Sequence, residues 1–93
     1  MIFEWDKKKN AVNVKKHGLS FEEAVRVFLD EKRIEKLDED HSTLEEERFK
    51  VLGLVHKVVV VIYTERKENI RLISARFAEK EEVDEYYSNY DLR

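Results

Sequence analysis

Residues 48–78 constrain the fold more than any other part of the chain, because they contain three consecutive segments rich in β-forming residues. These segments cover residues 48–54, 57–64 and 69–78. The connections between them are short enough for β-hairpins. The longest apolar run, Val58 to Tyr63, has the length of a strand, and no run is long enough to span a membrane. An antiparallel sheet is therefore the expected centre of the fold.

The first 30 residues carry the signals of a short strand and two helices. Residues 2–5 alternate like a strand, and Asp6 has the position of an N-cap for a helix over 7–16 that Gly18 would end. A second helix begins at the capping box Ser20-Phe21-Glu22-Glu23 and should end near residue 30. Its expected apolar face consists of Phe21, Ala24, Val25, Phe28 and Leu29.

The remaining segments complete the expected architecture. They are a candidate edge strand at 34–37, an acidic surface loop at 38–47 and a last helix at 79–90 with Val83, Tyr86, Tyr87 and Tyr90 on one face. The predicted fold class is α+β, with one antiparallel sheet of three or four strands, two N-terminal helices and a C-terminal helix. We expect the helices to cover one face of the sheet, and residues 1–93 to form a single domain.

The composition supports a folded domain with a thin core. Charged residues make up 42% of the 93 residues, but hydrophobic residues also make up 42% and aromatic residues 11%. There is no cysteine, so no disulfide can reinforce the fold, which fits a reducing compartment. No secretory signal is evident, and we expect a cytoplasmic protein.

The charge of the chain is unevenly distributed. The formal net charge is −3, which argues against a nucleic-acid-binding protein at first sight. Residues 1–17, however, hold five lysines against Glu4 and Asp6, and residues 66–76 hold four basic side chains against Glu68. Two basic stretches in an acidic protein indicate either ordinary surface charge or a local anion-binding surface.

No pattern of metal ligands or activated nucleophiles stands out. The three histidines, His17, His41 and His56, lie in separate segments, and Asp38, Asp40 and His41 are better interpreted as part of a solvated acidic loop than as a metal site. Ser20 serves as a helix cap, and no glycine-rich phosphate loop is present. We expect neither a metal nor a cofactor.

Arg71 and Arg76 are the more informative polar residues. They lie five residues apart in one predicted strand, so in a regular strand they face opposite sides of the sheet unless a bulge shifts the phase. An arginine facing the helix-covered side needs a carboxylate such as Glu46 or Glu47, or an anionic ligand. The guanidinium group suits phosphate oxygens. An Arg–Glu pair and a phosphate site therefore both remain open.

Trp5 and His17 also allow two interpretations. Trp5 could anchor the first strand in the core or, beside Lys9 and His17, offer a stacking face to a nucleobase. His17 could simply end its helix, or it could act as an acid or base, because histidine titrates near neutral pH.

The motifs in their order along the chain resemble the BrnT family of toxins. In the first half they are Phe3-Glu4-Trp5-Asp6, Lys9, Asn13, Lys16-His17-Gly18 and Ser20-Phe21-Glu22-Glu23-Ala24. In the second half they are Asp40-His41-Ser42, Glu46-Glu47-Arg48-Phe49, Leu52-Gly53, Tyr63-Thr64-Glu65-Arg66 and Ile70-Arg71-Leu72-Ile73-Ser74-Ala75-Arg76. The resemblance implies a RelE-like fold and a metal-independent ribonuclease that blocks translation. It also implies a BrnA-type antitoxin, contact with operator DNA only through that antitoxin, and no contact with membranes.

The resemblance further implies which residues support activity, namely Trp5, Lys9, His17, Glu47, Arg66 and Arg76. We expect Arg66 and Arg76 to hold the phosphate. Glu47 or His17 would act as base and His17 or Lys9 as acid, and Trp5, Lys16 and Arg71 would contact RNA. The alternative is a binding module whose basic stretches contact a partner protein or a nucleic acid without catalysis.

Overall fold

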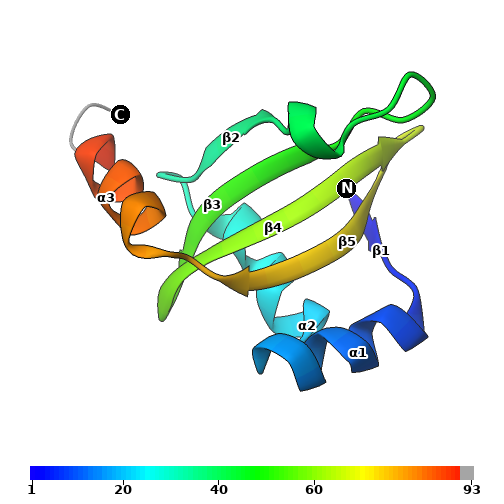
Figure 1. The fold of residues 1–93 in the computed structure, drawn as a ribbon, viewed down its shortest axis with the longest axis horizontal. Coiled ribbons are helices and arrows are strands. Elements are labelled where there is room, and N and C mark those ends of the chain that lie inside the picture. Colours follow the sequence, from blue (N-terminus) through cyan, green and yellow to red (C-terminus); the bar gives the residue numbers. More distant parts are fainter. Residues whose placement is uncertain (91–93) are drawn as a thin grey trace.

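A five-stranded mixed sheet forms the centre of the structure, a computed structural model that describes residues 1–90 (Figure 1). Its strands are β1 (Ile2–Glu4), β2 (Ile34–Leu37), β3 (Phe49–Val55), β4 (Lys57–Arg66) and β5 (Asn69–Phe77). Its helical segments are α1 (Lys7–His17), α2 (Phe21–Ala24), η1 (Val25–Leu29), η2 (Glu39–His41) and α3 (Lys80–Ser88), of which η1 and η2 are 3₁₀ helices. None of the described helices is both long and apolar enough to cross a membrane.

The strand order is β1-β5-β4-β3-β2, which confirms an α+β fold but corrects the expected sheet. The two hairpins β3–β4 and β4–β5 and the edge strand β2 are antiparallel, as predicted. β1, however, joins the sheet as a fifth strand and runs parallel to β5, with Phe3 opposite Ile70. The expectation of a purely antiparallel sheet of three or four strands was therefore wrong, because local sequence patterns identify a strand without specifying its partner.

Helices cover both faces of the sheet, not one face as expected. In Figure 1 the chain from α2 to β2 passes behind the sheet, and α3 stands at one end of the sheet. The main core lies under α2 and η1 and consists of Leu19, Phe21, Ala24, Val27, Val51, Val59, Val61, Tyr63, Ile70, Leu72 and Ala75. A second core of Leu52, Val58, Val60 and Tyr86 is packed against Ile34, Ile62, Ala78 and Val83. Because Tyr86 and Val83 belong to α3, this helix covers part of the opposite face.

The second predicted helix changes its geometry after one turn. It continues from α2 into the 3₁₀ helix η1, so Val27 becomes fully buried and Leu29, expected on the apolar face, is 80% exposed. A 3₁₀ helix has about three residues per turn, which places Val27 over the core three residues after Ala24. Gly53 of β3 allows this approach, because a Cβ atom there would lie 2.8 Å from the Cβ of Val27.

The predicted caps are confirmed. The Asp6 side chain accepts hydrogen bonds from the backbone N–H groups of Lys8 and Lys9, and Ser20 and Glu23 form the reciprocal capping box. Gly18 ends α1 in the left-handed conformation with φ 68°, which a glycine adopts without the cost of a Cβ atom. These local signals fix the two helices at the positions that the sequence indicated.

Asn13 attaches α1 to the edge of β5. β1 pairs only with Asn69–Arg71, so the later part of β5 has no neighbouring strand on that side. The buried Asn13 amide fills this gap: its Nδ2 donates to the carbonyl oxygens of Ala75 and Leu19, both at 2.8 Å, and its Oδ1 accepts from the N–H of Ala75 at 3.1 Å. One side chain thus provides the hydrogen bonds that an adjacent strand would otherwise supply.

Replacing Asn13 with alanine should lower the free energy of unfolding by roughly 3 kcal/mol, because it leaves buried backbone groups of Ala75 and Leu19 without partners. Chemical denaturation would measure the change. The matched control is Asn89→Ala, which removes one local hydrogen bond to the Glu85 carbonyl at the end of α3 and should cost well under half as much. Equal losses in the two variants would contradict this role of Asn13.

Candidate functional site

The structure distributes the sequence-predicted site residues over three neighbouring regions. Lys9, Lys16 and His17 lie on α1 beside β5. Arg66, Arg71 and Glu47 lie near the end of the sheet formed by the β4–β5 hairpin. Arg76 lies at the other end of β5, next to α3.

A groove of about 290 Å³ separates α1 from the middle of β5. It is lined by Lys8, Lys9, Val12, Asn13, Lys16, His17, Ile73 and Ser74. The sequence-predicted residues Lys9, Lys16 and His17 therefore do come together, and Lys8 adds a further basic side chain to the lining. Three of the lining residues are lysines and none of them is acidic, so the groove is cationic.

A β-bulge sets the directions of Arg71 and Arg76. Ile62 pairs with Ser74 and Tyr63 pairs with Leu72, so Ile73 is an extra residue in β5. Leu72 and Ala75 consequently both reach the main core, and Arg71, Ser74 and Arg76 face the opposite side. The bulge that would shift the phase is therefore present, so neither arginine faces the main core, and neither of them pairs with Glu46 or Glu47.

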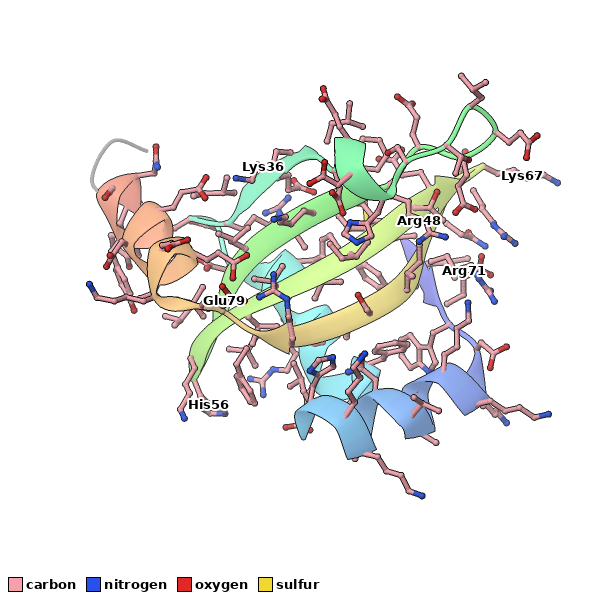
Figure 2. The ribbon with its side chains drawn as sticks, in the orientation of Figure 1. Lys36, Arg48, His56, Lys67, Arg71 and Glu79 are labelled. Atoms are coloured by element: carbon pink, nitrogen blue, oxygen red, sulfur yellow. The ribbon has the colours of Figure 1, made fainter. Side chains whose placement is uncertain are left out.

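Arg71 connects the α1 groove with the hairpin end of the sheet. Hydrogen bonds from the backbone of Lys9 and Lys8 lower the pKa of Asp6, and the nearby charges of Lys9 and Arg71 lower it further. Arg71 is also opposite Thr64 in β4, whose hydroxyl donates to the Glu47 carbonyl at 2.8 Å. Figure 2 shows Arg48, Lys67 and Arg71 at this same end of the sheet.

Arg66 lies at this end and remains largely free. Its guanidinium group is 3.8 Å from the Glu46 carboxylate, and its side chain is 58% exposed, so this ion pair is weak. Glu46 makes a shorter contact of 3.0 Å with Nε of Arg48. Arg66, Glu46 and Glu47 line the same shallow depression. We call Lys9, Lys16, His17, Arg71, Arg48 and Arg66 the basic strip.

Arg76 is held by a carboxylate of α3. Its two terminal nitrogens lie 2.7 and 2.9 Å from the two oxygens of Glu82, a bidentate pair. The hydrogen bond from Arg76 lowers the pKa of Glu82 to about 2, although partial burial opposes the shift. Glu82 also accepts from the backbone N–H of Glu79 in the capping box of α3. The Arg76 side chain therefore attaches the start of α3 to the sheet.

Arg66 and Arg76 do not meet at one phosphate, contrary to our expectation. Arg66 is opposite Asn69, and Arg76 is opposite Val60, so the two positions lie six residues apart along β4. At the rise of a β-strand this is about 20 Å. A phosphate bound at the hairpin end can reach Arg66 and Arg71, but it cannot also reach the guanidinium group that Glu82 holds.

Trp5 packs into the structure. It is half-buried against the main core, and its ring lies edge-on to Phe21 with a centroid distance of 6.1 Å. This contact favours the interpretation of Trp5 as an anchor for the turn between β1 and α1.

Within residues 1–90 no three His, Cys, Asp or Glu side chains are grouped as metal ligands would be. Asp38 and His41 of the acidic loop instead bond to each other, with 2.7 Å between the Asp38 carboxylate and Nδ1 of His41. Sequence reasoning assigned no function to this pair or to Arg48. The available signals were the cluster of Asp38, Asp40 and His41, which was interpreted as a solvated loop, and the motifs that contain His41 and Arg48.

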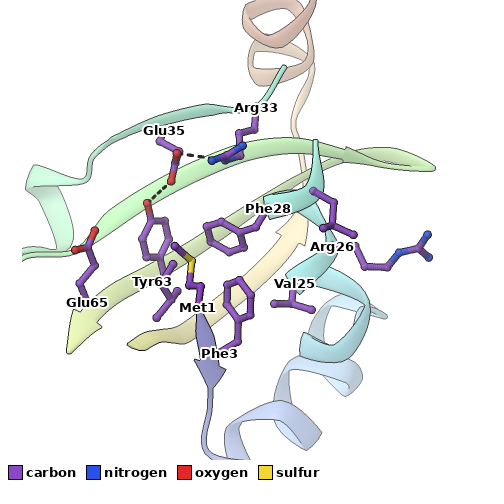
Figure 3. A pocket seen from close by; sticks show the side chains of 11 residues that line it. Met1, Phe3, Val25, Arg26, Phe28, Arg33, Glu35, Tyr63 and Glu65 are labelled. Atoms are coloured by element: carbon purple, nitrogen blue, oxygen red, sulfur yellow. Dashed lines mark hydrogen bonds and ion pairs between the residues drawn. The ribbon is translucent and has the colours of Figure 1, made fainter. Parts of the chain in front are cut away.

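An apolar pocket of about 500 Å³ lies on the main-core side, away from the basic strip. Figure 3 shows Phe3, Phe28 and Tyr63 around it, with the Tyr63 hydroxyl donating to Glu35 at 2.8 Å. Burial and this hydrogen bond raise the pKa of Tyr63 well above its ordinary value. None of the sequence-predicted site residues lines the pocket.

The fold and surface together define a small α+β protein with a cationic strip along one sheet edge and end. The sequence matches, over residues 5–82, the family described as "Ribonuclease toxin, BrnT, of type II toxin-antitoxin system". The fold is similar to the 1.1 Å crystal structure of the Brucella abortus ribonuclease toxin BrnT, with a TM-score of 0.63 and 25% identity over 86% of this chain and 100% of that one. No curated protein matches the chain.

The chain belongs to the BrnT family, because the match covers most of its length. It is therefore a ribonuclease toxin of a type II toxin–antitoxin system, a class of protein that acts together with an antitoxin. The family assignment confirms the resemblance inferred from the motifs.

Replacing Glu82 with glutamine should weaken the attachment of α3 in a pH-dependent manner. The folded state holds the Glu82 pKa at about 2, below its ordinary value of 4.5, so the stabilisation is complete above pH 4.5 and disappears as the pH falls toward 2. We expect the variant to be less stable than the parent at pH 7, by about 2 kcal/mol, and the difference to shrink on acidification. Thermal denaturation from pH 7 to pH 2.5 measures it.

Glu81→Gln is the control for this experiment, because Glu81 is an exposed residue in the same first turn of α3. It should show little change at either pH. A stability difference between Glu82→Gln and the parent that stays constant with pH would contradict the assignment.

Proposed function

We propose that the chain is a metal-independent endoribonuclease that cleaves single-stranded RNA bound along the basic strip and thereby inhibits translation in the cytoplasm. Residues 1–93 act as one BrnT-like toxin domain. A BrnA-type antitoxin neutralises it and provides the contact with operator DNA. The family assignment supports ribonuclease activity, and the finer statements rest on the chemistry of the strip.

The observation that carries this proposal is the position of Arg71. It lies between the groove that holds Lys9, Lys16 and His17 and the sheet end that holds Arg66. The two basic stretches of an acidic sequence thus become one surface in the fold. Positive charge concentrated in this way attracts a phosphodiester backbone although the net charge of the chain is −3.

The strip offers the functional groups that metal-free RNA cleavage needs. The 2′-hydroxyl of RNA is the nucleophile, so the protein must bind the phosphate, remove one proton and supply another. Arg66 and Arg71 are placed to bind phosphates. His17 and Lys9 share one groove and are acid–base candidates there, and Glu47 is the candidate at the hairpin end. Arg76 contacts a phosphate in this scheme only after its pair with Glu82 opens.

The separation of Arg66 from Arg76 favours a second candidate, a module that binds RNA or a partner protein without cleaving RNA. In that case the strip supplies affinity alone, and the pair of Arg76 with Glu82 is purely structural.

Incubation of the purified protein with single-stranded RNA in excess EDTA distinguishes the two candidates. We expect fragments that end in a 2′,3′-cyclic phosphate and begin with a 5′-hydroxyl, because the 2′-hydroxyl attacks the adjacent phosphorus. Intact RNA at protein concentrations that saturate binding would support the non-catalytic module, and cleavage only without EDTA would contradict metal independence.

Arg71→Ala should weaken RNA binding and reduce its dependence on salt. Loss of one phosphate contact lowers the slope of log K against log salt concentration by about 0.7 for a single strand. Binding of a 2′-deoxy analogue, measured by fluorescence anisotropy at several salt concentrations, tests this. The matched control is Arg26→Ala, since Arg26 lines the apolar pocket on the main-core side. An equal effect of both substitutions would place the RNA elsewhere.

A further inference from the structure

A buried carboxylate orients an exposed histidine at the edge of the open sheet face. The Asp38 carboxylate, 6% exposed, lies 2.7 Å from Nδ1 of His41, whose side chain is 62% exposed. Within residues 1–90 no group bonds to the other ring nitrogen, Nε2. When Nδ1 carries the proton and donates to Asp38, Nε2 presents its lone pair to solvent.

The loop that carries this pair is fixed to the start of β3. The Asp38 N–H donates to the Arg48 carbonyl at 2.8 Å, and the Arg48 N–H donates to the Ser42 hydroxyl oxygen at 2.8 Å. The Ser42 hydroxyl in turn donates to the Asp38 carbonyl at 2.7 Å. These three hydrogen bonds join the loop that carries Asp38 and His41 to the backbone of Arg48, a residue of the basic strip. The Asp38–His41 pair is therefore held in a fixed position relative to Arg48.

The alternation of β2 places Asp38 on the same sheet face as the arginines. Ile34 reaches the second core and Lys36 contacts Glu85 of α3, so the next residue with that orientation is Asp38. Leu37 is opposite Phe49, which sets Asp38 beside Arg48 at the neighbouring position. η2, which includes His41, therefore sits at the rim of the face that also carries Arg66 and Arg71.

We infer that His41 is the general base of RNA cleavage and that Asp38 is its positioning residue; this assignment rests on the proposed ribonuclease function. Nε2 of His41 takes the proton of the 2′-hydroxyl as that oxygen bonds to phosphorus. The bond from phosphorus to the 5′-oxygen breaks, and this oxygen takes a proton from solvent. The products are a 2′,3′-cyclic phosphate and a 5′-hydroxyl, and Asp38 stabilises the imidazolium that forms.

His41 is better equipped for this role than His17. His17 lies at the end of α1, where no described carboxylate orients its ring. The charged groups on the elements around His41 are Asp38, Glu39 and Asp40 of its own turn, Glu35 and Lys36 of β2, Glu45, Glu46, Glu47 and Arg48 of the following loop, and Lys50 of β3. Among them only Asp38 contacts the ring.

The test measures cleavage of single-stranded RNA in EDTA by the parent, His41→Ala and His41→Gln. Both variants should cleave at least about 100-fold more slowly, and both should bind a 2′-deoxy analogue like the parent. Any dependence of the parent rate on pH that arises from the base should disappear in both variants. Added imidazole should raise the rate of His41→Ala, because it replaces the missing base.

His56→Asn is the control, because His56 lies at the opposite end of the sheet from Arg48 (Figure 2) and asparagine tolerates its φ of 68°. It should cleave like the parent. If His41→Ala fails to fold, His41→Gln decides the question, since glutamine can still donate to Asp38. Cleavage by His41→Gln within threefold of the parent rate would overturn the assignment of His41 as the base but not the ribonuclease function. A loss of analogue binding as large as the loss of cleavage would do the same. A parent protein that leaves RNA intact would overturn the proposed function itself.

Discussion

The contact between Asn13 and Ala75 determines where α1 lies, and much of the surface depends on it. β5 has a strand neighbour on one side along its whole length but only three paired residues on the other. The buried amide completes the unpaired stretch and holds the helix against it. Because Lys9, Lys16 and His17 project from that same helix, the position of one neutral side chain sets the spacing between the cationic groove and the arginines of the sheet.

The bulge at Ile73 is the second constraint, and it decides between the two arrangements of Arg71 and Arg76 that the strand pattern left open. Residues that alternate regularly would direct one arginine of β5 into the main core. The extra residue shifts the alternation of side chains by one position. Leu72 and Ala75 are therefore buried on one face of the sheet, while Arg71 and Arg76 lie on the other. A bulge has no reliable signature in a single sequence, and its effect on a functional surface is therefore visible only in three dimensions.

Local sequence signals predicted most helices and strands, but they could not predict which distant segments pair with one another. The capping residues Asp6 and Ser20 and the two hairpin connections identified three of the strands and both N-terminal helices. The parallel partner of β1, the change to 3₁₀ geometry at Val25 and the side of the sheet covered by α3 depend on contacts between distant residues. Of the candidate site, the sequence indicated the groove residues and Arg71, because charge clustering is visible along the chain. It could not show that Glu82 holds Arg76.

The pair of Arg76 with Glu82 also shows why a family motif does not by itself assign a role to each residue. Arg76 stands in the Ser-Ala-Arg motif on which the resemblance was based, yet here its guanidinium group is fully engaged by α3. A bidentate carboxylate presents nearly the geometry of a phosphate, so the same side chain can serve either partner but not both at once. RNA at that end of the sheet would have to compete with Glu82, and the start of α3 would lose one of its attachments. Arg66, in contrast, makes only the 3.8 Å contact with Glu46, so a phosphate at the hairpin end would displace a weaker ion pair than the one that holds Arg76.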